Sequence, residues 1–120
     1  MNASEIIKQD AERNRIDPAT ALTAVNDLVQ SGDGILLKEN DSVLLLKKLR
    51  PRVVEAHLFT VDQPMMLSKS LLGFKKKLEE SDIQTVYGKA DNPQIVNLMK
   101  KLGFRVEDSD LSQYNWKFET

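Results

Sequence analysis

The chain has 120 residues, 41% of them hydrophobic and 29% charged, with a formal net charge of −1, and this composition predicts one soluble globular domain over residues 1–120. The charge gives no general attraction to nucleic acid or anionic lipid, and no apolar run approaches the roughly 20 residues of a membrane span. The absence of cysteine excludes disulfides, thiol nucleophiles and sulfur-ligated metals, and the polar N-terminus is unlike a signal peptide, so we expect a cytoplasmic protein.

Two short helices are predicted at the start of the chain. The first covers about residues 3–14 and begins with a capping box, in which Asn2 is followed three places later by Glu5. The second begins at Asp17-Pro18, where the aspartate caps the helix and the proline takes its first turn. Because the helices are short and adjacent, we expect them to pack as a pair.

The hydrophobic period then changes to that of strands, over residues 34–62. Three strands are predicted, with a hairpin turn at 39–41 and with Pro51 between the second and the third strand. The third, VVEAHLFTV, is rich in β-branched and aromatic residues and is apolar on both faces except at Glu55 and His57. This pattern is typical of a central strand.

The helical period returns at Pro64 and places four apolar residues on one face: Leu67, Leu71, Phe74 and Leu78. A short strand (IQTVYG) follows, then a helix that Asp91 or Asn92 caps and Gly103 ends, and then two strands, FRVED and YNWKFE. The predicted order is ααβββαβαββ, an α/β (α+β) fold with a central mixed sheet flanked by helices and at least one parallel pair of strands.

Residues 92–104, NPQIVNLMKKLGF, resemble a segment of the GNAT superfamily of acyl-CoA-dependent N-acetyltransferases. The family pattern there is an asparagine, a helix and a closing Leu-Gly-Phe, which Asn92 and residues 102–104 supply. The resemblance covers roughly residues 17–120 and implies a GNAT-like fold. If acetyl-CoA binds, the resemblance and the helix start at Pro64 imply five contact residues: Gln63, Ser68, Lys69, Ser70 and Asn92.

Three departures from the family pattern argue against acyl-CoA chemistry. The family holds pyrophosphate on a glycine-rich loop, but residues 62–69 contain no glycine, Pro64 lacks an N–H, and Met65 and Met66 occupy the place of the phosphates. Met99 stands where the family often has a tyrosine that protonates the CoA thiolate, and a thioether has no proton to give. The chain also begins with a helix where members usually begin with a strand, so one sheet edge is expected to be missing or supplied by a partner.

Glu55 and His57 are the candidate catalytic residues, because they lie two apart on one face of the predicted central strand. In the family a carboxylate on this strand acts as general base toward the amine, and a neutral histidine can shuttle a proton near pH 7. The alternative is that both are solvated or hydrogen-bonded on an outward face. Tyr87 or Tyr114 is the candidate substitute for the missing acid, with structural packing as the alternative role. No cluster of residues has metal-ligand spacing.

The basic segment KKLRPR at 47–52 also has two interpretations. It is a solvated strand end and turn, or it meets nucleic acid, CoA phosphates or an acidic partner. We favour the solvated interpretation, because the chain as a whole is not basic and aromatic residues do not interleave with the cations.

These features lead to two main hypotheses. The first is a non-catalytic binding or structural module of GNAT-like fold, without a cofactor, that holds a protein partner or a second copy at the sheet edge or in the former cofactor cleft. Overall similarity to small GNAT-like proteins of tailed bacteriophages then implies a virion or accessory protein, in the host cytoplasm or the virion. The second is an unconventional acetyl-CoA-dependent N-acyltransferase, in which residues 68–70 bind phosphate and Glu55 or His57 is the base. A nucleic-acid-binding protein ranks third.

Overall fold

The chain forms a mixed sheet with two helices on each face, and the computed structural model describes residues 1–89 and 93–120. The elements are α1 (Ala3–Arg13), α2 (Pro18–Gln30), β1 (Gly34–Glu39), β2 (Ser42–Arg50), β3 (Val53–Thr60), α3 (Pro64–Glu79), β4 (Thr85–Gly88), α4 (Pro93–Lys101), β5 (Val106–Asp108) and β6 (Trp116–Glu119). The predicted order ααβββαβαββ and the α/β class are confirmed. The predicted cap of α4, Asp91 or Asn92, lies outside the described residues.

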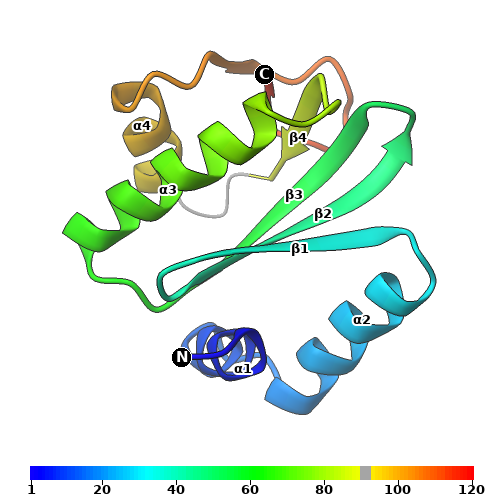
Figure 1. Ribbon diagram of the computed structural model, residues 1–120, viewed down its shortest axis with the longest axis vertical. Coiled ribbons are helices and arrows are strands. Elements are labelled where there is room, and N and C mark those ends of the chain that lie inside the picture. Colours follow the sequence, from blue (N-terminus) through cyan, green and yellow to red (C-terminus); the bar gives the residue numbers. More distant parts are fainter. Residues whose placement is uncertain (90–92) are drawn as a thin grey trace.

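Local sequence signals account for the starts of the first two helices. The Asn2 side chain accepts the N–H of Glu5 (2.9 Å), and the Glu5 carboxylate accepts the N–H of Asn2 (3.3 Å), which is the predicted capping box. Asp17 accepts the N–H of Thr20 (3.0 Å) at the start of α2. The two helices pack as the predicted pair on one face of the sheet (Figure 1).

The sheet has the strand order β1-β2-β3-β4-β6-β5. β3 is therefore a central strand, as its composition predicts. β3 and β4 form the parallel pair, and the other neighbouring strands are antiparallel. In Figure 1, α1 and α2 lie on one side of the strands, and α3 and α4 lie on the other.

Each face of the sheet has its own hydrophobic core. The core under α3 and α4 includes Leu71, Phe74 and Leu78, and the partly buried Leu67 packs against it, so all four residues predicted for this face of α3 contribute. The core under α1 and α2 includes Ile6 and Ile7. Because side chains alternate along a strand, β3 sends Val54, Ala56 and Leu58 to the first core and Phe59 to the second.

The parallel pair at the centre of the sheet is short. β3 and β4 pair only from Val53 and Thr85 to Glu55 and Tyr87. β4 ends at Gly88, whereas β3 continues to Thr60 with no described strand beside it on that edge. The two strands therefore part in the middle of the sheet, and this opening positions the candidate site.

Candidate functional site

A cleft of about 690 Å³ lies where β3 and β4 part. Its walls come from α1, α2, the unpaired half of β3, α4 and Trp116 of β6. Both candidate catalytic residues, Glu55 and His57, line it. Ligand sites are typically concave and carry a few convergent polar groups on largely apolar walls, so this cleft is the candidate functional site.

Glu55 stands at the point where the strands separate and is half-buried. Its Oε2 atom accepts a hydrogen bond from the Tyr114 hydroxyl at 3.0 Å. Burial, followed by the hydrogen bond to Glu55, raises the pKa of the Tyr114 hydroxyl above 10.0, so the tyrosine keeps its proton at neutral pH. Tyr114 therefore holds the carboxylate of Glu55 in one orientation at the wall of the cleft.

His57 and Asp10 stand further along the same cleft. The exposed His57 ring packs on Phe59, with 4.5 Å between ring centroids. Asp10, on α1, accepts the backbone N–H of Thr60 (3.1 Å) at the unpaired edge of β3. Burial raises the pKa of Asp10 above 3.8, while the Thr60 N–H and the charge of His57 act in the opposite direction. The cleft thus gathers two carboxylates and an imidazole.

Sequence reasoning found Glu55 and His57 but missed Asp10. A signal was present: Asp10 follows Ile6 and Ile7 at helical spacing and precedes Ala11, so it interrupts the buried stripe of α1. A carboxylate on the apolar face of an amphipathic helix needs a partner in the fold, and here the partner is the free edge of β3.

The turn between Val61 and the start of α3 is more open than the sequence predicts. Met65 is 80% exposed and Met66 is 39% exposed, so these side chains project into solvent and do not fill the turn. The N-cap residue Gln63 makes no side-chain cap bond, and Pro64 has no N–H to donate. The N–H groups of Met65 and Met66 lie in the first turn, where they have no partner within the helix.

The predicted cofactor-binding residues are not equivalent in the structure. Gln63 and Lys69 are exposed near the start of α3, whereas Ser68 is half-buried and donates its hydroxyl to the Pro64 carbonyl (3.3 Å). Ser70 is fully buried and donates to Asp62 (2.7 Å), so its hydroxyl does not face an anion at the helix start. Asn92 lies outside the described residues.

Asp62 fixes the shape of the glycine-free turn. Its carboxylate accepts the hydroxyls of Ser42 (2.6 Å) and Ser70 (2.7 Å) and the backbone N–H of Asp41 (3.1 Å). These bonds tie the β1–β2 turn to the beginning of α3. A buried polar network in which every member is satisfied makes the local structure rigid.

The residue expected in place of the catalytic acid is part of the core. Met99 is 5% exposed and packs under α3 and α4, so it gives no proton to the cleft. The two candidate substitutes lie on the other face of the sheet: Tyr87 donates to Asp110 (2.7 Å), and Tyr114 donates to Glu55. Gly88 ends β4 beside the cleft, where a Cβ atom would overlap the indole ring of Trp116.

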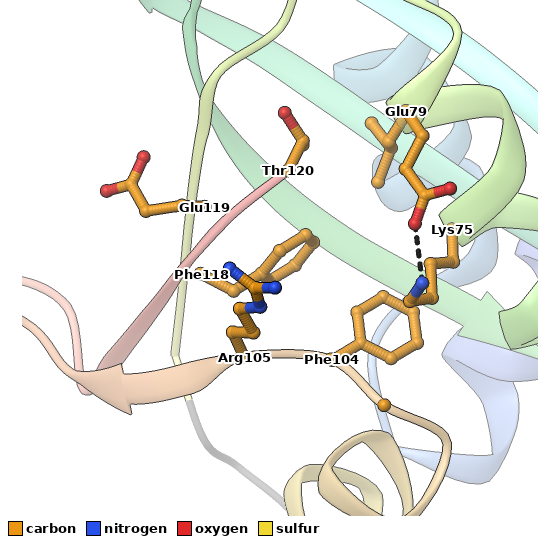
Figure 2. A pocket seen from close by; sticks show the side chains of 9 residues that line it. Lys75, Glu79, Phe104, Arg105, Phe118, Glu119 and Thr120 are labelled. Carbon is orange, nitrogen blue, oxygen red and sulfur yellow. Dashed lines mark hydrogen bonds and ion pairs between the residues drawn. The ribbon is translucent and has the colours of Figure 1, made fainter.

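A separate polar pocket of about 420 Å³ lies between α3, residues 103–105 and the C-terminal end of β6 (Figure 2). Figure 2 shows Lys75 paired with Glu79 on one wall, and Arg105, Glu119 and Thr120 on the other side. Its charges are of both signs, and it shares no lining residue with the cleft. Within residues 1–89 and 93–120, no three His, Asp or Glu side chains form a metal-binding group, and no helix has the length and apolar character to span a membrane.

Comparisons with known proteins identify the fold. No family model matches the chain, and no curated protein sequence matches it. Among solved structures, a spermidine N-acetyltransferase from Vibrio cholerae has a TM-score of 0.57 at 15% identity, with 97% of this chain and 85% of that chain covered. PaiA N-acetyltransferase from Thermoplasma acidophilum, in complex with coenzyme A, has a TM-score of 0.56 at 20% identity, with 93% and 77% covered.

A ribosomal-protein-alanine N-acetyltransferase from Brucella melitensis has a TM-score of 0.52 at 10% identity, with 87% of this chain and 76% of that chain covered. Identities this low establish the fold and not the activity. The chain therefore has a GNAT-like fold, as residues 92–104 and the element order predict.

Proposed function

We propose that this chain is an acyl-CoA-dependent N-acyltransferase in which Glu55 accepts the proton of the attacking amine. The observation that carries the proposal is the cleft at the parting of β3 and β4, which places Glu55, His57 and Asp10 around one opening. The similar folds of N-acetyltransferases, one of them bound to coenzyme A, support the same activity. This is the second of the two functions expected from the sequence.

The unpaired edge of β3 fits the pantetheine arm of an acyl-CoA. The Thr60 N–H points to that edge, where Asp10 accepts it. N–H groups alternate along a strand, so the Leu58 N–H faces the same edge. Pantetheine is an extended chain with two amides, which are suitable partners for a free strand edge. Bound acyl-CoA would supply the thioester whose acyl group is transferred.

The start of α3 fits the pyrophosphate in part. The N–H groups of Met65 and Met66 and the positive end of the helix dipole favour an anion there, and Lys69 is exposed one turn later. Pro64 removes one donor, and no glycine brings the backbone closer. We therefore expect coenzyme binding that is weaker than a glycine-rich loop would give.

The residues of the cleft suit an amine acceptor. Asp10 and Glu55 attract a protonated amine, which releases one proton to solvent before its nitrogen can attack. The carboxylate held by Tyr114 then removes a second proton as the nitrogen bonds to the acyl carbon. The carbon–sulfur bond breaks in the same transfer, and the proton moves from nitrogen to Glu55. His57 passes a proton to solvent. Water protonates the departing sulfur, because Met99 has no proton to give.

Calorimetric titration with acetyl-CoA tests coenzyme binding. We expect a Kd of about 100 μM or tighter, which is about −5.5 kcal/mol. Turnover is followed with a thiol-detecting reagent, which has no background here because the chain contains no cysteine. Spermidine and an alanine-initiated peptide serve as acceptor probes.

Two variants with the same chemical change separate the role of Glu55 from general effects of lost charge. Glu55→Gln should abolish turnover and retain acetyl-CoA binding, because glutamine can still accept the hydrogen bond from Tyr114. Glu80→Gln, at an exposed site after α3, should behave as the wild type. Full turnover by Glu55→Gln would exclude Glu55 as the base, and no binding of any acyl-CoA at millimolar concentration would exclude the enzyme.

The non-catalytic module is the second candidate, and two observations favour it. Pro64 and Met99 remove groups that acyl transfer normally uses, and β1 is an edge strand on which Ile35 is 52% exposed. In this case the free edge of β1 binds a protein partner or a second copy. Light scattering tests it, since the module predicts a dimer or a capturable partner together with no acyl-CoA binding. The bacteriophage and cytoplasmic assignments stay predictions.

A further inference from the structure

A small apolar cavity lies behind the cleft, on the α3–α4 side of the sheet. Its volume is about 60 Å³, and every side chain that lines it is hydrophobic. Leu71 and Phe74 of α3 form one wall, and Met99 of α4 forms another. Cavities of this kind stay dry, because they offer a water molecule no hydrogen-bond partners. An apolar ligand group is therefore the occupant that its chemistry favours.

The cavity adjoins the cleft, because the two share wall residues. Four residues line both: Ala56, Leu58, Ile95 and Trp116. Because side chains alternate along β3, Ala56 faces the cavity while Glu55, the preceding residue, faces the amine side of the cleft. The apolar space therefore begins one residue away from the proposed general base.

The far end of the cavity is closed by aromatic rings. Phe104 and Phe118 meet edge to face, with 5.1 Å between centroids, and they line both the cavity and the polar pocket of Figure 2. Trp116 stacks on Phe118 at 6.0 Å and lies against Gly88, which leaves no room for a Cβ atom. These rings pack against one another, so the cavity limits the length of its occupant.

We propose that this cavity receives the hydrocarbon tail of the acyl group, so that the preferred donor carries a straight aliphatic chain of about four carbons. The inference rests on the proposed function. A water molecule takes up about 30 Å³ in the liquid, and a methylene group is of similar size, so the 60 Å³ hold about two carbons beyond acetyl. Filling the cavity restores dispersion contacts that its lining side chains lack.

Met99 has a clear role under this proposal. The GNAT pattern often has a tyrosine at this position, whereas here an unbranched thioether lines an apolar space. Methionine adapts its shape to irregular apolar surroundings and brings no polar hydroxyl into the cavity. The residue that removes an acid from the site thus contributes a wall suited to a hydrocarbon chain.

The first test compares acetyl-, propionyl-, butyryl- and hexanoyl-CoA as donors. One well-fitting methylene changes kcat/KM by about tenfold or more, so we expect butyryl-CoA to exceed acetyl-CoA by about 100-fold and hexanoyl-CoA to fall again. Binding is followed in parallel by the fluorescence of Trp116, the only tryptophan of the chain, which lies in the wall of the cavity. Equal kcat/KM values for acetyl- and butyryl-CoA would overturn the inference.

Variants that change the cavity in opposite directions make the second test. Ala56→Val fills part of it and should favour acetyl-CoA, whereas Leu58→Ala enlarges it and should move the optimum toward hexanoyl-CoA. Leu72→Ala is the control, because Leu72 is 45% exposed on the outer side of α3 and should leave the preference unchanged. A shared shift in all three variants would show a general effect of destabilisation and contradict the assignment.

Xenon provides a readout of the cavity without catalysis, since dry apolar cavities take it up. Shifts of the Met99, Leu58 and Ile95 methyl signals under xenon pressure are expected in wild type and should weaken in Ala56→Val. If xenon binds and acetyl-CoA reacts but longer donors do not, the cavity is only a packing defect and the inference alone fails. If no acyl-CoA of any length binds, the proposed function itself is wrong, and the acyl assignment falls with it.

Discussion

The turn before α3 depends on one carboxylate, so Asp62→Ala should destabilise the protein strongly. Asp62 accepts the hydroxyls of Ser42 and Ser70, both fully buried, and the backbone N–H of Asp41. The substitution removes all three hydrogen bonds at once. It also weakens the connection between the β1–β2 turn and α3, which Ser70 then maintains through its bonds to Glu39 and Asn40.

The size of the effect follows from what the donors can do afterwards. A hydrogen bond to a charged group contributes about 1.5–3 kcal/mol. Ser42 keeps a second partner in Thr60 (2.6 Å), and Ser70 keeps the Glu39 carbonyl (3.2 Å), whereas the Asp41 N–H has no alternative among the bonds described. We therefore expect a loss of about 3 kcal/mol in the free energy of unfolding, below the sum of three full bonds.

Urea denaturation followed by Trp116 fluorescence measures this loss. With an m-value of about 1.5 kcal/mol/M, the midpoint of Asp62→Ala should fall by about 2 M urea. Asp82→Ala removes a carboxylate from an exposed turn and should change stability by less than about 0.5 kcal/mol. Equal midpoints for the two variants would refute the argument that the Asp62 network holds the turn.

Three further predictions concern the cleft. Gly88→Ala should cost about 1–3 kcal/mol in urea denaturation and shift the emission of Trp116, because the new methyl group overlaps the indole ring. Tyr114→Phe should lower kcat by about tenfold with little change in the KM for acyl-CoA, because the Glu55 carboxylate loses the bond that orients it, and an unchanged kcat would contradict this role. Asp10→Asn should raise the free energy of unfolding at pH 7, because burial raises the pKa of Asp10 above 3.8 and the charged carboxylate therefore destabilises the fold. The difference in stability between the variant and the wild type should disappear toward pH 4, where Asp10 becomes protonated. A difference that does not change with pH would contradict this reasoning.

The sequence predicts well those features that local signals determine. The capping box at Asn2, the cap at Asp17 and the composition of β3 each specify their element within a few residues, and the structure confirms them. The element order and residues 92–104 then indicate the GNAT-like fold. Glu55 and His57 lie in the cleft because the parity of β3 puts them on one face.

The remaining parts of the site depend on contacts between distant residues. Asp10 and Thr60 are hydrogen-bonded although they are 50 residues apart in the sequence, and Tyr114 and Glu55 although they are 59 apart. The hydrophobic periodicity of the sequence predicts neither pair. The apolar cavity exists because side chains from α3, α4, β3 and β6 leave space between them, and the amino-acid composition does not reveal such a space. The openness of the turn likewise depends on Met65 pointing outward.

Because Met65 and Met66 point outward, the glycine-free turn is a weaker argument against pyrophosphate binding than the sequence suggests. A turn filled by side chains would exclude pyrophosphate, but the observed turn lacks one donor, at Pro64, and keeps two N–H groups without helical partners. One lost bond to a charged group costs about 1.5–3 kcal/mol, which lowers affinity about 10- to 150-fold without abolishing it.

An acyl chain that fills the apolar cavity offsets part of this loss. Two buried methylene groups contribute about 0.8 kcal/mol each, or about 1.6 kcal/mol together. On this argument, the glycine-free turn and the methionine-lined cavity are related features of one binding site, in which affinity for the donor moves from the phosphate end toward the acyl end. The ratio of Kd values for butyryl-CoA and acetyl-CoA measures that shift directly, and it should be near 1:15 in favour of butyryl-CoA. Equal Kd values would mean that the two departures are unrelated and that the cavity contributes nothing to donor binding.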